Sequence, residues 1–298
     1  MISSFCSAIN NNINSDRLNQ FELFMNVDVI MCTWNSNKPW FMQCLSSIKN
    51  EIPICHYIVV DRFSKDDTIK VIKQFFKKAI IIESDIELGK ARQEAIKHVD
   101  TEWFVFMDDD VELCSGWFKD ITNCITEKTG SINGFPLPTL EWLRKFSLYT
   151  RKMAFDLRRE WKVGRGIYLS NTIIYTNLVK DWSPPRFLSS GEDAHLSRHI
   201  SNQGYDVIFL RNLQVEHHGK WGVYSAKKNL WHYSGIRLIR YTDTTTIKLI
   251  RRFLTSPLKG LYASLRLREP FIIPYLILSE YYNLMGWLQW NKNIVWKR

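Results

Sequence analysis

Three adjacent carboxylates follow an apolar run in "WFVFMDDDVEL", where Asp108, Asp109 and Asp110 come directly behind residues 103–107. Neighbouring carboxylates at the end of a buried strand repel one another and lose hydration, so a cation or solvent must offset them. If the extended geometry continues, Asp108 and Asp110 project to one side, and Asp109 projects to the other, toward a basic partner or water. Two convergent carboxylates suit a divalent cation that keeps positions free for phosphates, and a solvated acidic loop is the alternative.

Two later motifs place ionisable side chains at the expected ends of elements. In "SSGEDAHLSRHI", Glu192 and Asp193 open a helix, where Asp193 could take a proton from an attacking hydroxyl. The alternative is a capping box from Ser190 to Asp193, in which the carboxylate accepts from a backbone N–H. "VEHHGK" ends a strand-like run with His217 and His218, either of which could bind the same cation or be structural.

The first half of the chain offers candidate ligands for a nucleotide. Asp61 closes the run "YIVVD" and could accept a hydrogen bond from a nucleobase N–H, while Ser64 and Asp67 form a capping box for the next helix. In "ELGKARQEAI", Lys90 and Arg92 lie in a first helical turn, where they could meet a diphosphate. The alternative is a solvated first turn, although basic residues there oppose the helix dipole.

Short β-rich runs alternate with helical patterns from residue 27 to about residue 110. The expected strands are "VDVIMCT", "HYIVVD", "AIIIES" and "EWFVFMD", and the expected helices lie near residues 38–50, 66–78 and 88–99. This alternation predicts right-handed crossovers and a parallel sheet that is covered on both faces. Ligands collect at the carboxyl ends of such strands, where Asp61 and the three aspartates fall.

The second half predicts further strands that complete a mixed sheet. These are "SINGF", "GIYLSNTIIYT" and "YDVIFLRNLQVEHH", with a helix near residues 191–203 that ends at Gly204. We expect the Trp- and Arg-rich stretch that reaches about residue 165 to be an irregular flap or substrate loop. Six scattered cysteines without a C-x-x-C pair indicate neither a zinc knuckle nor a disulfide framework, and favour a reducing, cytosolic compartment.

The net charge of +10 belongs to the C-terminal end. Residues 220–298 hold 14 Lys and Arg against three Asp and Glu, whereas residues 1–219 hold 26 against 27. A basic end on a neutral body indicates an anionic partner, either a membrane surface or nucleic acid. A basic amphipathic helix precedes the apolar segment 271–290, which we expect to lie at a membrane interface. Packing on the catalytic body and a membrane span are the alternatives, although Pro274, Glu280 and Gly286 argue against a span.

In chain order the motifs are "MCTWN", "VVDRFSKDDT", "LGKAR", "MDDD", "GED" and "VEHH". As an ordered set over about residues 27–219, they resemble the family 2 inverting glycosyltransferases with the GT-A fold. The resemblance implies an α/β fold, with an α/β/α sandwich around a mixed, mostly parallel sheet. It also implies transfer of a sugar, with inversion, from a UDP- or GDP-linked donor to a hydroxyl acceptor, with Mn²⁺ or Mg²⁺ as cofactor.

The resemblance also implies roles for individual residues. The expected catalytic base is Asp193. The expected nucleotide-sugar ligands are Thr33, Asn35, Asp61, Lys90, Arg92, Asp108 and Glu192. The expected metal ligands are Asp108, Asp110 and His217, with His217 preferred to His218 for its place after "VE". Arg62 and Phe63 stand where the family has Asp-Gly, which leaves the base and the sugar open.

We expect a polar extension over residues 1–24, a catalytic domain over 25–222 and a basic, aromatic-rich helical tail over 223–298. The tail favours a membrane surface as partner, a lipid-linked or glycan hydroxyl acceptor, and a peripheral position on the cytoplasmic face of a membrane. A sugar nucleotidyltransferase should begin with a G-x-G-T-R loop, which "CTWNSNKPW" lacks. A nucleic-acid-binding protein would leave the acidic strand ends unexplained, so we expect no nucleic acid partner.

Overall fold

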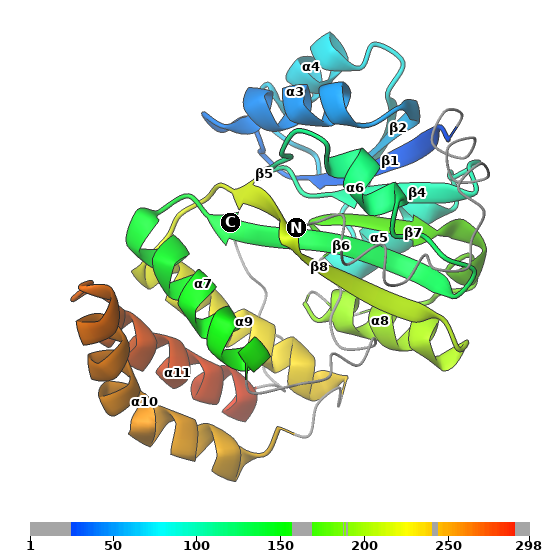
Figure 1. Ribbon diagram of the computed structural model, residues 1–298. Helices are drawn as coiled ribbons and strands as arrows, with labels where there is room; N and C mark the ends of the chain where they lie inside the picture. The colour runs from blue at the N-terminus through cyan, green and yellow to red at the C-terminus, as the bar shows by residue number, and fades with distance from the viewer. Residues whose placement is uncertain (1–24, 157–168, 187, 189, 240–243, 290–298) are drawn as a thin grey trace.

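The computed structural model describes residues 25–156, 169–186, 188, 190–239 and 244–289 (Figure 1). An eight-stranded mixed sheet with the strand order β3-β2-β1-β4-β7-β6-β8-β5 forms its centre. The strands are β1 (Val27–Thr33), β2 (Ile54–Asp61), β3 (Ile80–Glu83), β4 (Trp103–Met107), β5 (Val111–Glu112), β6 (Thr129–Pro138), β7 (Asn171–Tyr175) and β8 (Asp206–His217). Four of the seven strand pairings are parallel, as expected for a mixed sheet with a parallel first half.

Helices cover both faces of this sheet. On one face lie α3 (Phe41–Glu51), α4 (Thr68–Phe75) and α6 (Trp117–Thr122), and on the other lie α5 (Leu88–Ile96) and α8 (Glu192–Asn202). Central strand β1 is buried on both sides, with Val29 and Met31 in one core and Ile30 in the other. Such a continuous apolar run is typical of a parallel strand between two helical layers.

The register of the parallel strands brings three strand ends to one edge of the sheet. Thr33 at the end of β1 pairs with Asp61 at the end of β2, and Met31 pairs with Met107 at the end of β4. Asp108 directly follows Met107. The residues that follow these strands therefore converge, as the sequence predicts.

The second half confirms the expected strands and corrects one expectation. Helix α8 ends near Gly204, whose φ of 84° is a left-handed conformation that glycine adopts without a steric cost. The stretch that we expected to be irregular contains α7 (Glu141–Asp156), because Leu143 and Phe146 recur at helical spacing and pack into a third hydrophobic cluster. The rest of the expected flap, residues 157–168, and the expected extension, residues 1–24, lie outside the described residues.

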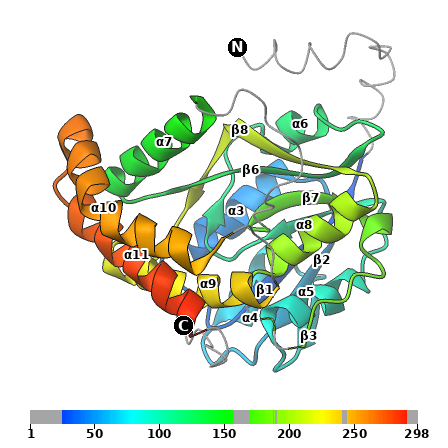
Figure 2. The same cartoon turned by 90° about the horizontal axis from the view of Figure 1, so that it is seen from below.

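Three helices form the C-terminal end of the described chain. They are α9 (Val223–Leu238), α10 (Thr246–Leu267) and α11 (Ile272–Leu288). Helix α11 lies between α9 and α10, and α7 lies alongside α10 and α11 (Figures 1 and 2). The Arg252 guanidinium on α10 joins the three helices, because it donates to the Glu280 carboxylate of α11 at 2.9 Å and to the Tyr233 hydroxyl of α9 at 2.9 Å.

The described part of the apolar segment 271–290 is α11, which packs mainly on α9 and α10 and also contacts α7. The expected position of this segment at a membrane interface stays a prediction. Among the described helices, none combines the length and the apolar character needed to cross a bilayer.

Candidate functional site

A cavity of about 430 Å³ lies where the carboxyl ends of the strands face the C-terminal helices. Its sheet side includes the predicted residues Thr33, Arg92, Asp108, Glu192, Asp193 and His217. Its helical side includes residues that sequence reasoning missed, which are Ser147, Trp221, Lys228, Trp231, His232 and Tyr275. Four predicted site residues do not line the cavity, because other contacts hold their side chains elsewhere. They are Asn35, Asp61, Lys90 and Asp110.

The Asp61 side chain joins the end of β1 to the loop that follows β2. Its carboxylate is fully buried and accepts from the Thr33 hydroxyl at 2.7 Å, from the Ser64 hydroxyl at 2.6 Å and from the Ser64 backbone N–H at 2.7 Å. A carboxylate has roughly four acceptor positions, so at most one remains for a nucleobase. The predicted capping box from Ser64 to Asp67 is wrong, because Ser64 instead donates to Asp61 and the Asp67 side chain makes no cap hydrogen bond to α4.

Asn35 and Phe63 hold left-handed backbone conformations in these two loops, with φ values of 50° and 48°. The Asn35 side chain accepts from the Lys65 N–H at 2.7 Å, so it ties the loops together and does not face the cavity. Strained backbone of this kind is concentrated at functional loops, where the surrounding structure maintains it.

Trp34 and Arg62 take the place at the cavity that the sequence assigned to Asn35. Both line the cavity, and the Arg62 guanidinium lies 5.2 Å from the centre of the Trp34 ring. Asp85 accepts from Arg62 at 2.6 Å and thereby fixes its orientation. The departure from the family pattern at Arg62 therefore builds a cation–π pair at the cavity wall.

Arg92 joins two of the predicted acidic residues. The guanidinium is buried, donates to the Asp108 carboxylate at 2.9 Å and donates to the Glu192 carboxylate through its other terminal nitrogen. One cation between two carboxylates leaves a net charge of about −1, so the guanidinium is not free to neutralise a diphosphate. Because the Arg92 side chain is buried, the alternative that it lies in a solvated first helical turn is wrong.

Lys90 lies elsewhere in the first turn of α5. Its ammonium group donates to Gln93 at 2.7 Å and to Ser183 at 3.3 Å. Because Lys90 and Arg92 are two residues apart on a helix, they cannot face the same side. The structure therefore brings only Arg92 to the cavity.

The three adjacent aspartates have three different environments. Asp108 pairs with Arg92, and Asp109 is buried and accepts from the Ser36 hydroxyl. We expected Asp109 to face a basic partner or water, and water is wrong, because the turn after β4 directs the carboxylate into the protein toward the loop after β1. Asp110 lies on the third side, with its carboxylate 3.2 Å from Nε2 of His217.

His217 and His218 are separated by the pleat of β8. His217 faces the cavity and Asp110, whereas the His218 ring pairs with the Glu112 carboxylate at 3.0 Å and stacks on Trp40 with ring centres 6.0 Å apart. The preference for His217 agrees with this placement. The 3.2 Å between the Asp110 oxygen and the His217 nitrogen is close to the roughly 3 Å that separates adjacent ligands of an octahedral Mg²⁺ or Mn²⁺ ion.

The expected three-residue metal site is only partly assembled. Asp108, Asp110 and His217 are not a group whose ligand atoms all lie within 4.8 Å of one another, because Arg92 draws the Asp108 carboxylate away. Asp110 and His217 have the donor chemistry and spacing that suit a divalent cation.

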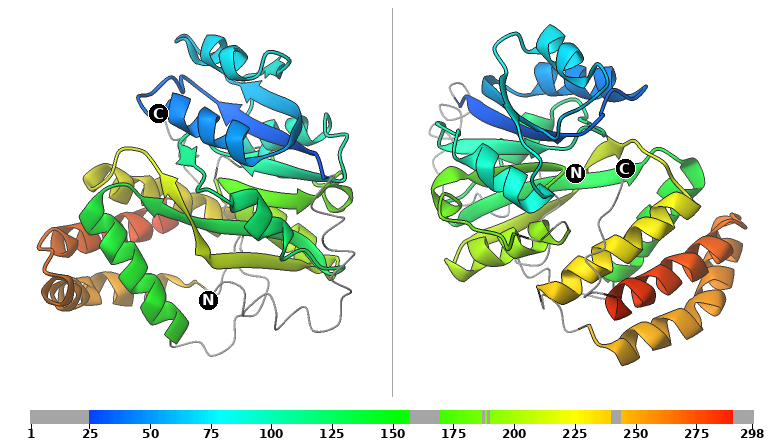
Figure 3. Two further views of the ribbon diagram at one scale, coloured as in Figure 1. Left: turned by 45° about the horizontal axis from the view of Figure 1, so that its top comes forward. Right: turned by 180° about the vertical axis from the view of Figure 1, so that it is seen from behind.

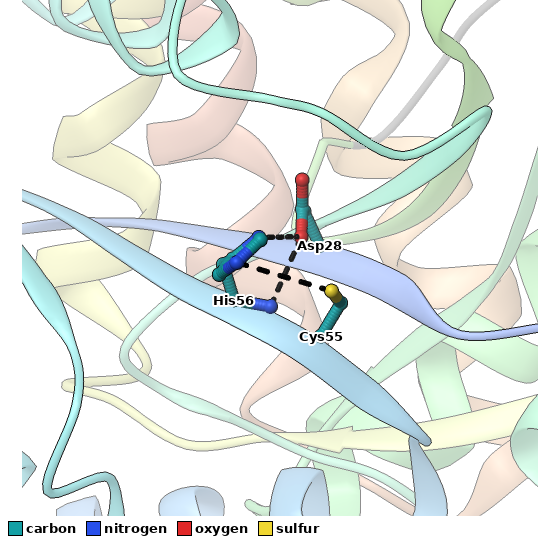
Figure 4. A group of neighbouring side chains, drawn as sticks. All are labelled: Asp28, Cys55 and His56. Atoms are coloured by element: carbon teal, nitrogen blue, oxygen red, sulfur yellow. Dashed lines mark hydrogen bonds and ion pairs between the residues drawn. The ribbon is translucent and has the colours of Figure 1, made fainter.

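Asp28, Cys55 and His56 form a separate group at the opposite end of the sheet (Figure 4). One Asp28 oxygen accepts from the His56 N–H at 3.0 Å and pairs with the His56 ring at 2.9 Å. The other accepts from the N–H groups of Asp100 at 2.8 Å and Thr101 at 3.2 Å. These four contacts use the acceptor positions of the carboxylate, so this group does not fit a metal.

The start of α8 presents Glu192 and Asp193 to the cavity. The residue that precedes the helix is Gly191, with a φ of 83°, and the Ser190 hydroxyl donates to the carbonyl oxygen of Trp231 at 2.9 Å. The predicted capping box from Ser190 to Asp193 is therefore wrong. Asp193 accepts from the Ala194 N–H at 2.7 Å, and its side chain lines the cavity.

At Glu192 and Asp193, burial and the paired groups shift the pKa in opposite directions. Removal from water raises the pKa of Glu192, against the lowering by Arg92, and it raises the pKa of Asp193, against the lowering by the Ala194 N–H. Proton acceptors with raised pKa values at a cavity wall are suited to general base catalysis near neutral pH.

Helix α9 supplies the opposite wall and is tightly joined to the start of α8. A Cβ atom on Gly235 would lie 2.1 Å from the carbonyl oxygen of Ser190, so only glycine allows this approach. Lys228, Trp231 and His232 of α9 line the cavity, and in the described part of the chain no ion pair holds Lys228. Burial lowers the pKa of His232, so its ring is neutral near pH 7.

The fold is that of GT-A glycosyltransferases. The structure resembles a mannosyltransferase, PcManGT from Pyrobaculum calidifontis in complex with GDP-Man and Mn²⁺, with a TM-score of 0.54 and 16% identity over 88% of this chain and 79% of that chain. It also resembles glucosyl-3-phosphoglycerate synthase from Mycobacterium tuberculosis in complex with Mg²⁺ and UDP, with a TM-score of 0.53 and 14% identity over 76% of this chain and 83% of that chain.

Sequence comparison finds similarity to one family over part of the chain. Residues 28–164 match the family described as "Glycosyl transferase family 2". The poly(ribitol-phosphate) beta-N-acetylglucosaminyltransferase TarS of Staphylococcus aureus (strain Mu50) is 28% identical over 130 residues, and the match covers 38% of this chain. The match spans only 22% of the length of TarS. This part of the chain is therefore similar to family 2 glycosyltransferases.

Proposed function

We propose that the protein transfers a sugar, with inversion at the anomeric carbon, from a nucleoside diphosphate donor to a hydroxyl acceptor. The observation that carries this proposal is the meeting of Arg92, Asp108, Asp193 and His217 in one cavity at the carboxyl end of the sheet. The neighbours with GDP-Man and UDP favour a GDP- or UDP-linked donor.

The nucleoside end of the donor would lie against the loops after β1 and β2. Thr33, Trp34 and Arg62 line this part of the cavity, and the flat Trp34–Arg62 pair offers a surface for a base. Asn35 and Asp61 would act as positioning residues for these loops, with one acceptor position of Asp61 left for a base N–H. Lys90 is assigned no contact with the donor.

The diphosphate would lie near Asp108, Asp110 and His217. Asp110 and His217, with Asp108, would hold Mn²⁺ or Mg²⁺, and the bound ion neutralises the negative charge that develops on the leaving diphosphate. Arg92 orients Asp108 and Glu192 and keeps both carboxylates in place.

Asp193 would remove the proton from the acceptor hydroxyl as that oxygen attacks the anomeric carbon. Burial raises the pKa of Asp193, which increases its basicity. Glu192, which is held by Arg92, would bind hydroxyl groups of the donor sugar.

The acceptor would enter along the wall formed by α7, α9 and α11. Trp231 and Tyr275 offer apolar ring faces to a sugar, and Lys228 offers a positive charge to an anionic acceptor. We propose a lipid-linked or membrane-resident acceptor, and a position of the protein on the cytoplasmic face of a membrane through residues 223–298. Helix α9 then belongs to both the catalytic cavity and the proposed membrane-binding part.

A donor screen tests the proposal. UDP-, GDP- and dTDP-sugars are tested with Mn²⁺, with Mg²⁺ and with EDTA, by thermal shift and by release of the nucleoside diphosphate. A donor that binds the folded state raises the melting temperature, and we expect one base to do so only with a divalent ion. If no nucleotide sugar changes the melting temperature or releases diphosphate with either ion, the proposal is overturned.

A further inference from the structure

The outer face of α10 has an apolar stripe that no other described element covers. Its aliphatic side chains repeat at intervals of three and four residues, and they range from 42% exposed at Ile250 to 79% exposed at Ile247. The stripe consists of Ile247, Ile250, Leu254, Leu258, Leu261 and Leu265. A helix of 22 residues is roughly 33 Å long, so the stripe is a continuous apolar ridge rather than a scattered set of exposed side chains.

The opposite face of α10 is fixed against α11. The buried residues on this face are Leu249, Ser256, Gly260, Ala263 and Ser264. A Cβ atom on Gly260 would lie 3.1 Å from the Cα atom of Ile273, so the two backbones approach closely. The ion pair between Arg252 and Glu280 also fixes the rotation of α10 about its axis, because a rotated helix would separate the two side chains. The stripe is therefore held outward by packing.

Positive charge flanks the stripe. Between Thr246 and Leu267 there are five Lys and Arg residues and no Asp or Glu. Four of the five are exposed, namely Lys248, Arg251, Lys259 and Arg266. Affinity for an anionic bilayer comes from burial of apolar area and from attraction to the lipid headgroups. Helix α10 can supply both, because its aliphatic stripe has cations and no acidic residue beside it.

We propose that the outer face of α10 docks the protein on an anionic lipid surface, with the helix in the plane of the interface. The Ile247–Leu265 stripe would enter the boundary between headgroups and acyl chains, and the cations beside it would contact the headgroups. The link to a membrane-resident acceptor rests on the proposed function, whereas docking itself requires no sugar transfer.

Two other occupants fit the face less well. A second copy of α10 would bring the same cations together without any acid to offset them, which disfavours pairing of two stripes. Single-stranded nucleic acid stacks on rows of aromatic rings, and this stripe is aliphatic.

Docking through α10 would also orient the cavity. Helix α11 separates α10 from α9, and α9 forms a wall of the cavity (Figure 3). Two helix-to-helix spacings place that wall roughly 20 Å from the lipid surface. The sugar end of a lipid-linked chain could reach across this distance, while its lipid stays in the bilayer.

Vesicle flotation of the full-length protein tests the proposal. The vesicles are phosphatidylcholine alone, or phosphatidylcholine with about 30% phosphatidylglycerol. The apolar variant carries Leu254→Ser, Leu258→Ser and Leu265→Ser, and the charge variant carries Lys248→Glu, Arg251→Glu and Lys259→Glu. The matched control is Met42→Ser, which removes an exposed apolar side chain from α3 on the catalytic body.

We expect the wild-type protein and the Met42→Ser control to float with anionic vesicles and to float less with neutral ones. The apolar variant should lose flotation on both. The charge variant should lose at least about 100-fold in partition onto anionic vesicles, since each lost basic residue contributes about fivefold and each added Glu is repelled. Nucleoside diphosphate release without vesicles should be equal for all four proteins, which separates a failure of docking from a failure of the proposed function.

Three results would overturn the proposal. The first is a wild-type protein that floats with neither kind of vesicle, and the second is an apolar variant that floats like the wild type. The third is self-association through the stripe, seen in analytical ultracentrifugation as a concentration-dependent mass that the leucine substitutions abolish. Circular dichroism of each variant verifies that the helices are retained.

Discussion

Buried carboxylates lie at both ends of the central sheet, and they differ in what surrounds their oxygens. At the amino end, the Asp28 carboxylate accepts from three backbone N–H groups and pairs with the His56 ring (Figure 4). At the carboxyl end, Asp108 and Asp110 pair with side chains and Asp193 accepts from one backbone N–H group, and Asp108 and Asp193 border a cavity. Backbone donors cannot leave, whereas side-chain partners can exchange for a ligand. The comparison separates a carboxylate that stabilises the fold from carboxylates that can serve chemistry.

The largest expected effect is on transfer by the Asp193→Asn variant. An amide cannot take the acceptor proton, so we expect kcat to fall by roughly 10²- to 10⁴-fold with little change in melting temperature. Steady-state release of nucleoside diphosphate in the presence of acceptor measures this. Asp181→Asn, at an exposed carboxylate paired with His199, is the control. An Asp193→Asn enzyme with wild-type kcat would remove the base from the proposed mechanism.

The Asp28→Asn variant should have the reverse phenotype. Its new NH₂ group faces backbone donors, so we expect the free energy of unfolding to fall by about 2 to 3 kcal/mol, with unchanged kcat per folded molecule. Urea unfolding measures the change. Asp67→Asn, at an exposed pair with Lys70, should stay within about 0.5 kcal/mol of wild type. A catalytic defect in folded Asp28→Asn protein would contradict the division between the two ends.

A somewhat smaller effect is expected on metal dependence. His217→Gln and Asp110→Asn should each weaken the apparent affinity for Mn²⁺ by at least about tenfold, because each removes a donor from the pair. A titration of Mn²⁺ against donor-dependent diphosphate release measures it. The neighbouring pair offers a matched control, since His218→Gln removes an imidazole that contacts Glu112 instead. Equal effects of the two histidine variants would contradict the assignment of His217.

Glu192 at the carboxyl end should add a pH dependence to the stability of the protein. Burial raises its pKa from 4.5 to about 7, so the folded protein holds a proton that the unfolded chain releases. Its contribution is fully present below pH 4.5 and is lost as the pH rises to about 7, with a slope of at most about 1.4 kcal/mol per pH unit. Glu192→Gln should lack this component in urea unfolding measured across the interval, and parallel curves would contradict the raised pKa.

The smallest expected effect is at Cys55. The Asp28 carboxylate already has four contacts, and nearby negative charge together with burial raises the pKa of the Cys55 thiol, so this group should not bind a divalent ion. Cys55→Ala should therefore leave the Mn²⁺-induced shift in melting temperature unchanged. A smaller shift in the variant would place a metal at the wrong end of the sheet.

The sequence predicts the sheet edge well because apolar runs mark strands and parallel strands end together. Asp108 and His217 were predicted from strand ends, Arg92 and Asp193 from helix starts, and Thr33 from the family resemblance. All five line the cavity. Secondary-structure patterns alone do not predict partners. The contact between Arg92 and Glu192 joins residues 100 positions apart, and only the folded chain shows that Arg92 is neutralised.

The remaining differences have two physical sources. Lys228 and His232 were not recognised as cavity residues. The composition of the tail indicates amphipathic helices, but composition does not show which of these helices packs against the sheet. Asp109 was assigned to water because strand geometry was extended through a turn. The periodicity of Leu143 and Phe146 was present in the sequence and was outweighed by the surrounding tryptophans and arginines.

The contact between Gly235 and Ser190 has a consequence for protein engineering. No side chain fits between α9 and the loop that precedes Asp193, so the boundary near residue 222 is not a usable fusion point. A chimera that joins residues 25–222 to the C-terminal helices of another enzyme would need to reproduce this glycine and its helix position to preserve the loop. Exchange of acceptor preference is better attempted by substitutions on the α9 surface than by exchange of the whole C-terminal segment.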